Sequence, residues 1–148
     1  ARVMSLNQPD TKMSKSIPEG CVFLMEKPED ILRKFKRAIT DSDTERCVRF
    51  DPQAKPGVSN LMQIYSAVTG KSFETIEAEF DGKGYGAFKP AVGEAVVELL
   101  RPIREETERL LADKGYLESV YRAGAEKASY VANKTLRKVY KKVGFLAR

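Results

Sequence analysis

Apolar residues recur at intervals of three and four positions through most of the chain after Met25. The first series consists of Ile31, Leu32, Phe35, Ala38 and Ile39, and this spacing places them on one face of a helix. Pro28 precedes them, at a position where proline favours the start of a helix. Because no sustained strand alternation follows Met25, the sequence predicts a mainly helical protein.

Turn-forming residues divide this periodic region into separate predicted helices. The first helix ends at Asp41–Thr44, and the second covers about residues 59–68 and ends at Gly70, which suits a C-cap. Ser72 is placed to cap a third, short helix. Gly82–Gly86 lacks the strand-to-helix setting of a phosphate-binding P-loop, so we interpret it as a tight turn between helices.

Two long helices are predicted on either side of Gly115. The first covers about residues 90–114, and Pro102 should bend it rather than end it, because the apolar pattern continues beyond that residue. Its apolar series is Val92, Val96, Leu99, Ile103 and Leu110. The series of the second helix is Leu117, Val120, Gly124, Ala128, Val131, Thr135 and Val139. Gly124 and Ala128 are small enough to let a neighbouring helix approach closely, which favours a helical bundle.

The first 25 residues follow a different pattern. Val3–Leu6 and Val22–Met25 are short apolar runs separated by a polar segment, and this arrangement predicts a strand, a loop and a second strand. We therefore expect a mainly α fold, in which a helical bundle carries the last strand and loop edge of an α/β domain.

The length and cysteine content narrow the class of protein further. At 148 residues the chain is long enough for one domain with a substantial core, and no apolar run approaches the roughly 20 residues that span a bilayer. Cys21 and Cys47 lack metal-like spacing, and the chain contains no histidine. We interpret both as buried, reduced cysteines of a cytoplasmic protein.

The pentapeptide Lys12-Met13-Ser14-Lys15-Ser16 concentrates groups that bind phosphate. Lys12 and Lys15 carry compact charges on flexible stems, and the hydroxyls of Ser14 and Ser16 can donate hydrogen bonds to phosphate oxygens. Met13 is suited to anchor the apolar side of such a loop. Taken alone, the same residues also fit an ordinary polar surface loop.

In its surroundings, this pentapeptide resembles the KMSKS loop that binds ATP in class I aminoacyl-tRNA synthetases. The resemblance extends from Arg2 to the C-terminus and, within that class, favours the bacterial tryptophanyl-tRNA synthetases over their tyrosine relatives. It rests on six further segments: Arg2–Leu6, Thr40–Asp43, Lys55–Leu61, Gly82–Pro90, Leu100–Arg104 and Gly124–Ala128. A HIGH-type motif, which the class carries upstream, is absent. We therefore expect the C-terminal part of a longer enzyme, inactive by itself.

The resemblance implies a domain organisation and a chemistry. Residues 1–25 would end a Rossmann-like nucleotide-binding domain, and residues 26–148 would form the helical region that binds the tRNA anticodon arm. Lys12–Ser16 would bind ATP, with catalytic roles for Lys12 and Lys15. The implied reaction joins tryptophan to tRNA(Trp) with ATP and Mg²⁺, in a homodimer that assembles through the missing half. No metal ligand in this chain can be named for that ion.

Positive charge accumulates toward the C-terminus, since no acidic residue follows Glu126. On a helix, four of these basic residues share one side and form a candidate tRNA-binding surface, the basic stripe of Lys134, Arg137, Lys138 and Lys141. Tyr130 and Tyr140 could stack on unpaired bases, although burial against the bundle explains either tyrosine equally well. A second candidate surface carries Arg33, Lys34, Lys36 and Arg37.

Two other functions stay open from the sequence. A stand-alone helical RNA-binding module would use the basic residues without any role for ATP. A structural or protein-binding domain would show no salt-dependent affinity for RNA. Protection of the Lys12–Ser16 loop by ATP in the longer protein would separate the ligase from the RNA-binding module.

Overall fold

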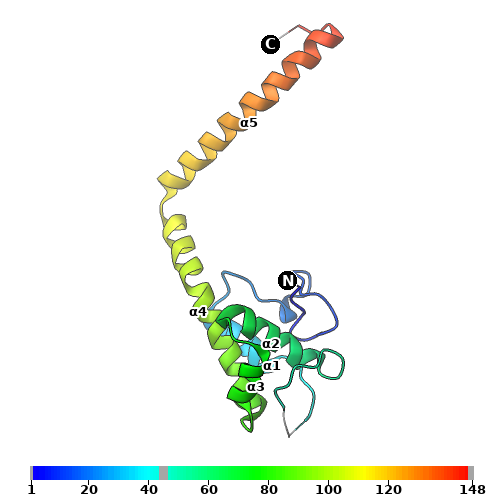
Figure 1. Cartoon of the computed structure of the whole chain (residues 1–148). Coiled ribbons are helices and arrows are strands. Elements are labelled where there is room, and N and C mark those ends of the chain that lie inside the picture. The colour runs from blue at the N-terminus through cyan, green and yellow to red at the C-terminus, as the bar shows by residue number, and fades with distance from the viewer. Residues whose placement is uncertain (1, 44–46, 147–148) are drawn as a thin grey trace. The chain divides into compact units, whose positions relative to one another are not determined.

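A computed structural model of the chain describes residues 2–43 and 47–146 (Figure 1). A short 3₁₀ helix, η1, covers Pro18–Gly20. The α-helices are α1 (Pro28–Arg37), α2 (Pro56–Thr69), α3 (Phe73–Phe80), α4 (Gly84–Ala112) and α5 (Lys114–Val143). No strand forms within the described residues, and the predicted mainly helical class is confirmed.

The chain divides into two compact units, Ala1–Arg104 and Glu105–Arg148. The first unit contains the amino-terminal segment as well as α1, α2, α3 and most of α4. The predicted domain boundary after residue 25 concerns a longer protein and stays a prediction. No helix in the described part of the chain is long and apolar enough to cross a membrane.

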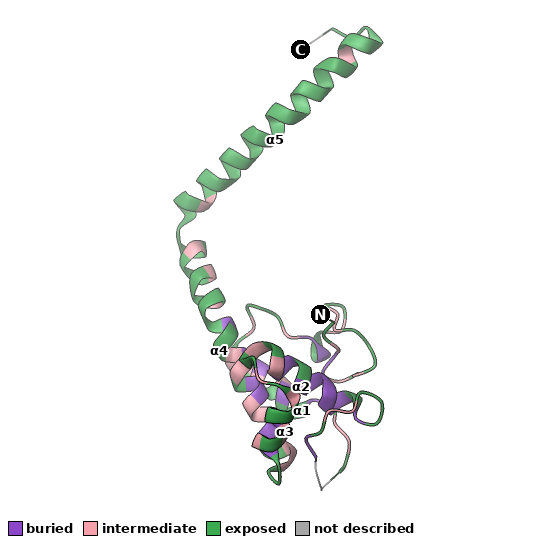
Figure 2. Cartoon of the chain, in the orientation of Figure 1, coloured by how far each residue is buried: buried purple, intermediate pink, exposed green. Residues whose placement is uncertain are grey.

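The first unit is built on one apolar core, to which all four of its helices contribute (Figure 2). The most completely buried side chains are Ile31, Phe35, Val58, Leu61, Met62, Ile76, Phe88 and Val92. Gly93 allows α4 to approach α1 closely, because a Cβ atom there would lie 3.2 Å from the Cβ of Phe35. Cys21 and Cys47 are buried and free, as predicted.

The local signals for helix ends are largely confirmed. Gly70 ends α2 in the left-handed conformation, with φ of 75°, and the Ser72 hydroxyl accepts a hydrogen bond from the Thr75 backbone N–H at the start of α3. The turn between α3 and α4 is shorter than predicted. It is complete by Lys83, since Gly84 already belongs to α4.

Several predicted boundaries were wrong. Helix α1 ends at Arg37 rather than at Asp41–Thr44, because Ala38 turns to an extended ψ of 139°; Ile39 is therefore exposed instead of joining the apolar face. Thr44 lies outside the described residues. Helices α2 and α4 start earlier than expected, at Pro56 and Gly84, whereas the continuation of α4 beyond Pro102 is confirmed.

The predicted buried face of α4 was also wrong after Val96, where the prediction named Leu99 and the structure buries Leu100. Its buried side chains repeat every four residues, at Phe88, Val92, Val96 and Leu100. Leu99 and Ile103, which the sequence pattern included, are exposed. Spacings of three and four fit the same periodic pattern equally well, and here the packing against the core selects the spacing of four.

The predicted strands near the N-terminus do not form. One isolated antiparallel bridge pairs Met4 with Lys12, and residues 22–25 carry no strand. A strand needs a neighbouring backbone along its length to pair its polar groups. The backbone of Leu6 instead bonds to loops on either side, accepting from Ile39 N–H at 2.8 Å and donating to the Gly20 carbonyl at 3.0 Å.

The second unit contains the end of α4 and all of α5. None of the described residues of α5 is buried (Figure 2), and a Cβ atom at Gly124 would meet nothing within 4 Å. No helix approaches Gly124 within the second unit, and the close approach stays a prediction. Tyr130 is exposed within this unit. Tyr140 packs edge-on against Phe145, with ring centroids 5.9 Å apart.

Candidate functional site

The base of the Lys12–Ser16 loop is held by backbone hydrogen bonds around the isolated Met4–Lys12 bridge, a short pairing that we call the ladder. Met13 N–H donates to the Val3 carbonyl at 3.0 Å, and Ser5 N–H donates to the Thr11 carbonyl at 2.8 Å. These two bonds flank the bridge between Met4 and Lys12. The first residue of the loop is therefore fixed in register against the segment that precedes it in the sequence.

Beyond this ladder, the loop divides into an apolar anchor and an exposed polar surface. Met13 packs against the apolar core, as predicted, whereas Lys12, Lys15 and Ser16 are exposed. Ser14 turns the chain, since its carbonyl accepts from Ile17 N–H at 3.1 Å. Neither lysine forms an ion pair with the described residues, so both charges are available to an external polyphosphate.

The opposite edge of the ladder is held by a residue that the sequence interpretation missed. Asn60, on α2, is 3% exposed, and its Oδ1 accepts from Met4 N–H at 3.0 Å while its Nδ2 donates to the Met4 carbonyl at 2.9 Å. The signal was a polar residue on the buried side of a helix, because such a group needs a hydrogen-bond partner.

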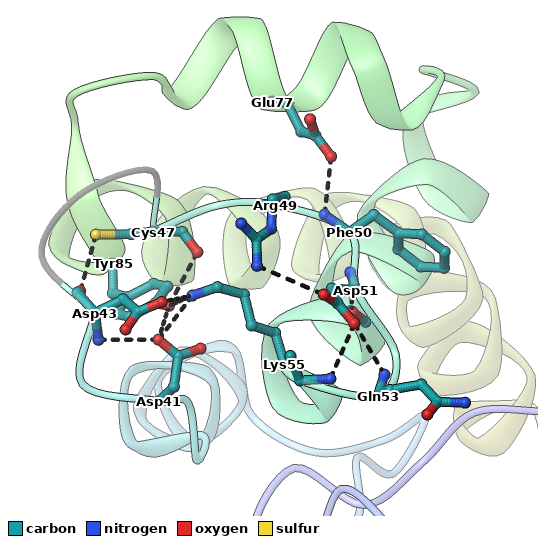
Figure 3. A network of polar contacts seen from close by, with 12 residues as sticks. Asp41, Asp43, Cys47, Arg49, Phe50, Asp51, Gln53, Lys55, Glu77 and Tyr85 are labelled. Atoms are coloured by element: carbon teal, nitrogen blue, oxygen red, sulfur yellow. Dashed lines mark hydrogen bonds and ion pairs between the residues drawn. The ribbon is translucent and has the colours of Figure 1, made fainter.

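A second polar cluster surrounds Lys55, whose side chain is 2% exposed (Figure 3). Its Nζ lies 2.9 Å from Asp41 Oδ1, 2.6 Å from Asp43 Oδ2 and 3.3 Å from the Tyr85 hydroxyl. The Tyr85 hydroxyl lies 2.6 Å from Asp41 Oδ1 and 2.9 Å from the Cys47 carbonyl oxygen. The cluster thus joins the loop after α1 to the start of α2 and the start of α4.

The charges of this cluster stabilise one another. Burial favours the neutral amine of Lys55, but its hydrogen bonds to Asp43 and Asp41 outweigh that effect and raise the pKa of Lys55. Burial also raises the pKa of Tyr85, and the hydrogen bond to Asp41 raises it further. At neutral pH the cluster therefore holds a charged lysine and a neutral tyrosine, an arrangement suited to fastening three segments together.

Mg²⁺ prefers carboxylate and phosphate oxygens. Within the described part of the chain, no three or more histidine, cysteine, aspartate or glutamate side chains lie together in a group that could hold a metal ion. We therefore assign no metal ligand and no metal-dependent step to residues of this chain.

The two candidate nucleic-acid surfaces differ in how free their charges are. All four residues of the basic stripe lie on α5 and are exposed. On α1, by contrast, the charge of Lys34 is engaged in contacts within the protein. Its Nζ lies 2.7 Å from Glu26 Oε1 and 2.7 Å from the Cys21 carbonyl oxygen. Arg33 pairs with Asp30, which leaves Lys36 and Arg37 as the exposed basic residues at the end of that helix.

The class of protein follows from the sequence and fold together. Residues 1–101 match the family model described as tRNA synthetases class I (W and Y). The matched region includes the Lys12–Ser16 loop, the ladder that anchors it and the cluster around Lys55. The chain therefore belongs to this family of class I tRNA synthetases.

Several of the similar proteins are tryptophan enzymes. The chain is 49% identical to tryptophan–tRNA ligases of Clostridium tetani and Wolinella succinogenes, over 99% of its own length in both cases. It spans 43% and 44% of those relatives, respectively. Crystal structures also match: tryptophanyl-tRNA synthetase of Campylobacter jejuni, complexed with ADP and tryptophan, is 25% identical over 98% of this chain and 44% of that one, with a TM-score of 0.79.

Proposed function

We propose that this chain is the C-terminal part of a tryptophan–tRNA ligase, which activates tryptophan with ATP and transfers it to tRNA(Trp). The observation that carries the proposal is the anchored loop with two exposed lysines, in a chain 49% identical to tryptophan–tRNA ligases. The related Campylobacter jejuni protein was solved with ADP and tryptophan, which supports a nucleotide and an amino acid as ligands. The proposal includes a cytoplasmic homodimer whose subunit contacts lie outside residues 1–148.

In this proposal the loop acts on the leaving group of the first reaction. When tryptophan attacks the α-phosphate of ATP, negative charge accumulates on the departing pyrophosphate. Lys12 and Lys15 stabilise that charge once the loop closes over the nucleotide, and charge stabilisation of this kind accelerates the chemical step. Ser14 and Ser16 bind phosphate oxygens, while Met13 keeps the loop attached to the core.

Residues 1–148 alone should show no detectable tryptophan-dependent exchange of pyrophosphate into ATP, whereas the full-length protein should show it. Positioning of both reactants supplies much of the rate enhancement of an enzyme, and one lysine-bearing loop cannot supply it. The measurement is isotope exchange with tryptophan, with tyrosine as the control amino acid. Pyrophosphate exchange by residues 1–148 would contradict the proposal that they form only part of the catalytic unit. Absence of exchange in the full-length protein would favour an RNA-binding module.

We further propose that the basic stripe on α5 contacts tRNA phosphates. Arg137→Ala and Lys141→Ala should each weaken tRNA binding by the full-length protein and reduce the slope of log affinity against log salt by about one unit. Sequence preference should change little, because phosphate contacts position an RNA without specifying its bases. The measurement is tRNA affinity across a series of salt concentrations.

Arg122→Ala is the matched control for this experiment. Arg122 is also exposed on α5, but its guanidinium pairs with Glu118 at 2.7 Å, outside the basic stripe. If the Arg137 and Lys141 variants keep the affinity and slope of the wild type, the stripe is a solvated surface. Lys36 and Arg37 on α1 would then be the next candidates.

A further inference from the structure

Asn60 is a buried polar residue whose side-chain hydrogen bonds leave its own helix entirely. It lies in the second turn of α2, between residues that pack into the core. Asparagine is a poor helix former because its side chain competes for backbone hydrogen bonds, so helix propensity does not account for it here. Both of its side-chain bonds go to the backbone of Met4, 56 positions away in the sequence.

The backbone of the amino-terminal segment presents two edges, and each edge is paired differently. On one edge, the Val3 carbonyl and the Ser5 N–H bond to Met13 and Thr11. On the other edge, the N–H and carbonyl of Met4 bond to Asn60. The amide of Asn60 therefore takes the place of a neighbouring strand and completes the pairing of Met4.

The hydrogen bonds between Asn60 and Met4 fix the position of the Lys12–Ser16 loop relative to α2. Met4 is the residue that bridges to Lys12, so the chain of contacts runs from Asn60 through Met4 to the first lysine of the loop. The apolar contact of Met13 with the core resists separation of the loop from the core, but it does not specify register along the segment as paired hydrogen bonds do.

We propose that Asn60 is a positioning residue for the ATP-binding loop, holding the Met4–Lys12 bridge in the register that aims the loop lysines at the phosphates. This inference rests on the function proposed above. It assigns Asn60 no contact with ATP, and its effect is transmitted through the backbone of Met4. A shift of the loop by about 1 Å would suffice to slow the reaction by about 10²-fold.

The test uses the full-length protein and three variants. Asn60→Ala removes both bonds to Met4, and Asn60→Asp keeps the shape and the acceptor while removing the donor. Ser59→Ala is the matched control: Ser59 is equally buried and adjacent, and its hydroxyl accepts from Asp51 N–H at 2.9 Å, away from the loop. The first readouts are kcat, the KM for tryptophan and the KM for ATP in pyrophosphate exchange. The second readout is the rate of hydrogen exchange of the backbone amides of residues 3–13.

We expect Asn60→Ala to lower kcat by about 10-fold to 100-fold, with the KM for tryptophan within about threefold of the wild type. Asn60→Asp should lower kcat in the same direction, and Ser59→Ala should leave it unchanged. The amides of Ser5 and Met13 should exchange at least about tenfold faster in Asn60→Ala, because the ladder opens locally, but not in Ser59→Ala.

The outcomes separate this inference from the proposed function. Unchanged exchange of residues 3–13 in Asn60→Ala would overturn the inference whatever the activity. Faster exchange together with a kcat equal to that of Ser59→Ala would also overturn it, since Asn60 would then stabilise the segment without positioning the loop. A wild-type protein inactive with tryptophan would reject the proposed function, and the hydrogen-exchange comparison would still decide whether Asn60 holds the loop base.

Discussion

Replacing Lys15 with alanine in the full-length protein should lower the maximal rate of tryptophan adenylation by about 10²-fold to 10³-fold, the usual effect of losing one group that stabilises transition-state charge. The affinity for ATP in the ground state should change much less, because the charge matters most as pyrophosphate departs. Lys15 is exposed and belongs to no ion pair of the described residues, so its removal should leave the fold intact. Single-turnover adenylation measured across ATP concentrations separates the rate from the affinity.

Lys114→Ala provides the control for charge alone, since Lys114 is an exposed lysine at the start of α5, far along the chain from the loop. It should adenylate tryptophan at the wild-type rate. In Lys15→Ala, the maximal rate could instead stay unchanged while ATP affinity and adenylation efficiency fall by the same factor. That result would show that Lys15 binds the substrate and the transition state equally.

Helices with local signals were predictable from the sequence. Pro28 begins α1 and Gly70 ends α2 as expected, because proline and glycine act through backbone geometry that depends on few neighbours. The end of α1 was not predictable. The next residues leave the helix because the Ile39 N–H bonds to the Leu6 carbonyl, a partner 33 positions earlier in the sequence.

The candidate loop was predictable as a motif, but the contacts that attach it to the rest of the fold were not. The pattern of Lys12–Ser16 is local, so the sequence located the exposed lysines and the anchoring role of Met13. The contact of Asn60 with Met4 and the cluster of Lys55 with Asp41 and Tyr85 each join segments far apart in sequence. Periodicity reports which face of an element is apolar, and it carries no information on which distant backbone a buried polar group meets.

The apolar series of α5 shows that periodicity also does not reveal whether an apolar face has a partner. Its spacing correctly predicted a helix, and the helix covers Lys114–Val143. No residue of the series is buried within the second unit, where Ala128, Val131, Thr135 and Val139 line an open hollow. A periodic pattern fixes the face of a helix that favours burial, whereas burial itself depends on a partner surface.

Replacing Lys55 with methionine should destabilise the chain by about 1.5–3 kcal/mol, the usual contribution of hydrogen bonds to a charged group, because Lys55 is buried while its partners Asp41 and Asp43 are 23% and 57% exposed and keep contact with water. Methionine preserves most of the side-chain volume, so the loss is electrostatic: Asp41 keeps the Tyr85 hydroxyl but loses its cation. The measurement is urea unfolding of wild type and variant at neutral pH. Lys71→Met is the control, because the Lys71–Glu79 pair is about one-third exposed on both sides and should contribute little.

The pH dependence of this difference identifies its cause. Partial burial raises the pKa of Asp41, but the hydrogen bonds from Tyr85 and Lys55 outweigh it, so the pKa lies below its ordinary value of 3.8. Ionised Asp41 therefore contributes stability that is fully present above the unfolded-state pKa and is lost as the pH falls through the lower folded-state value. The gap between wild type and Lys55→Met should consequently narrow well below pH 3.8. A gap of constant size across that range would instead indicate lost packing around the lysine stem.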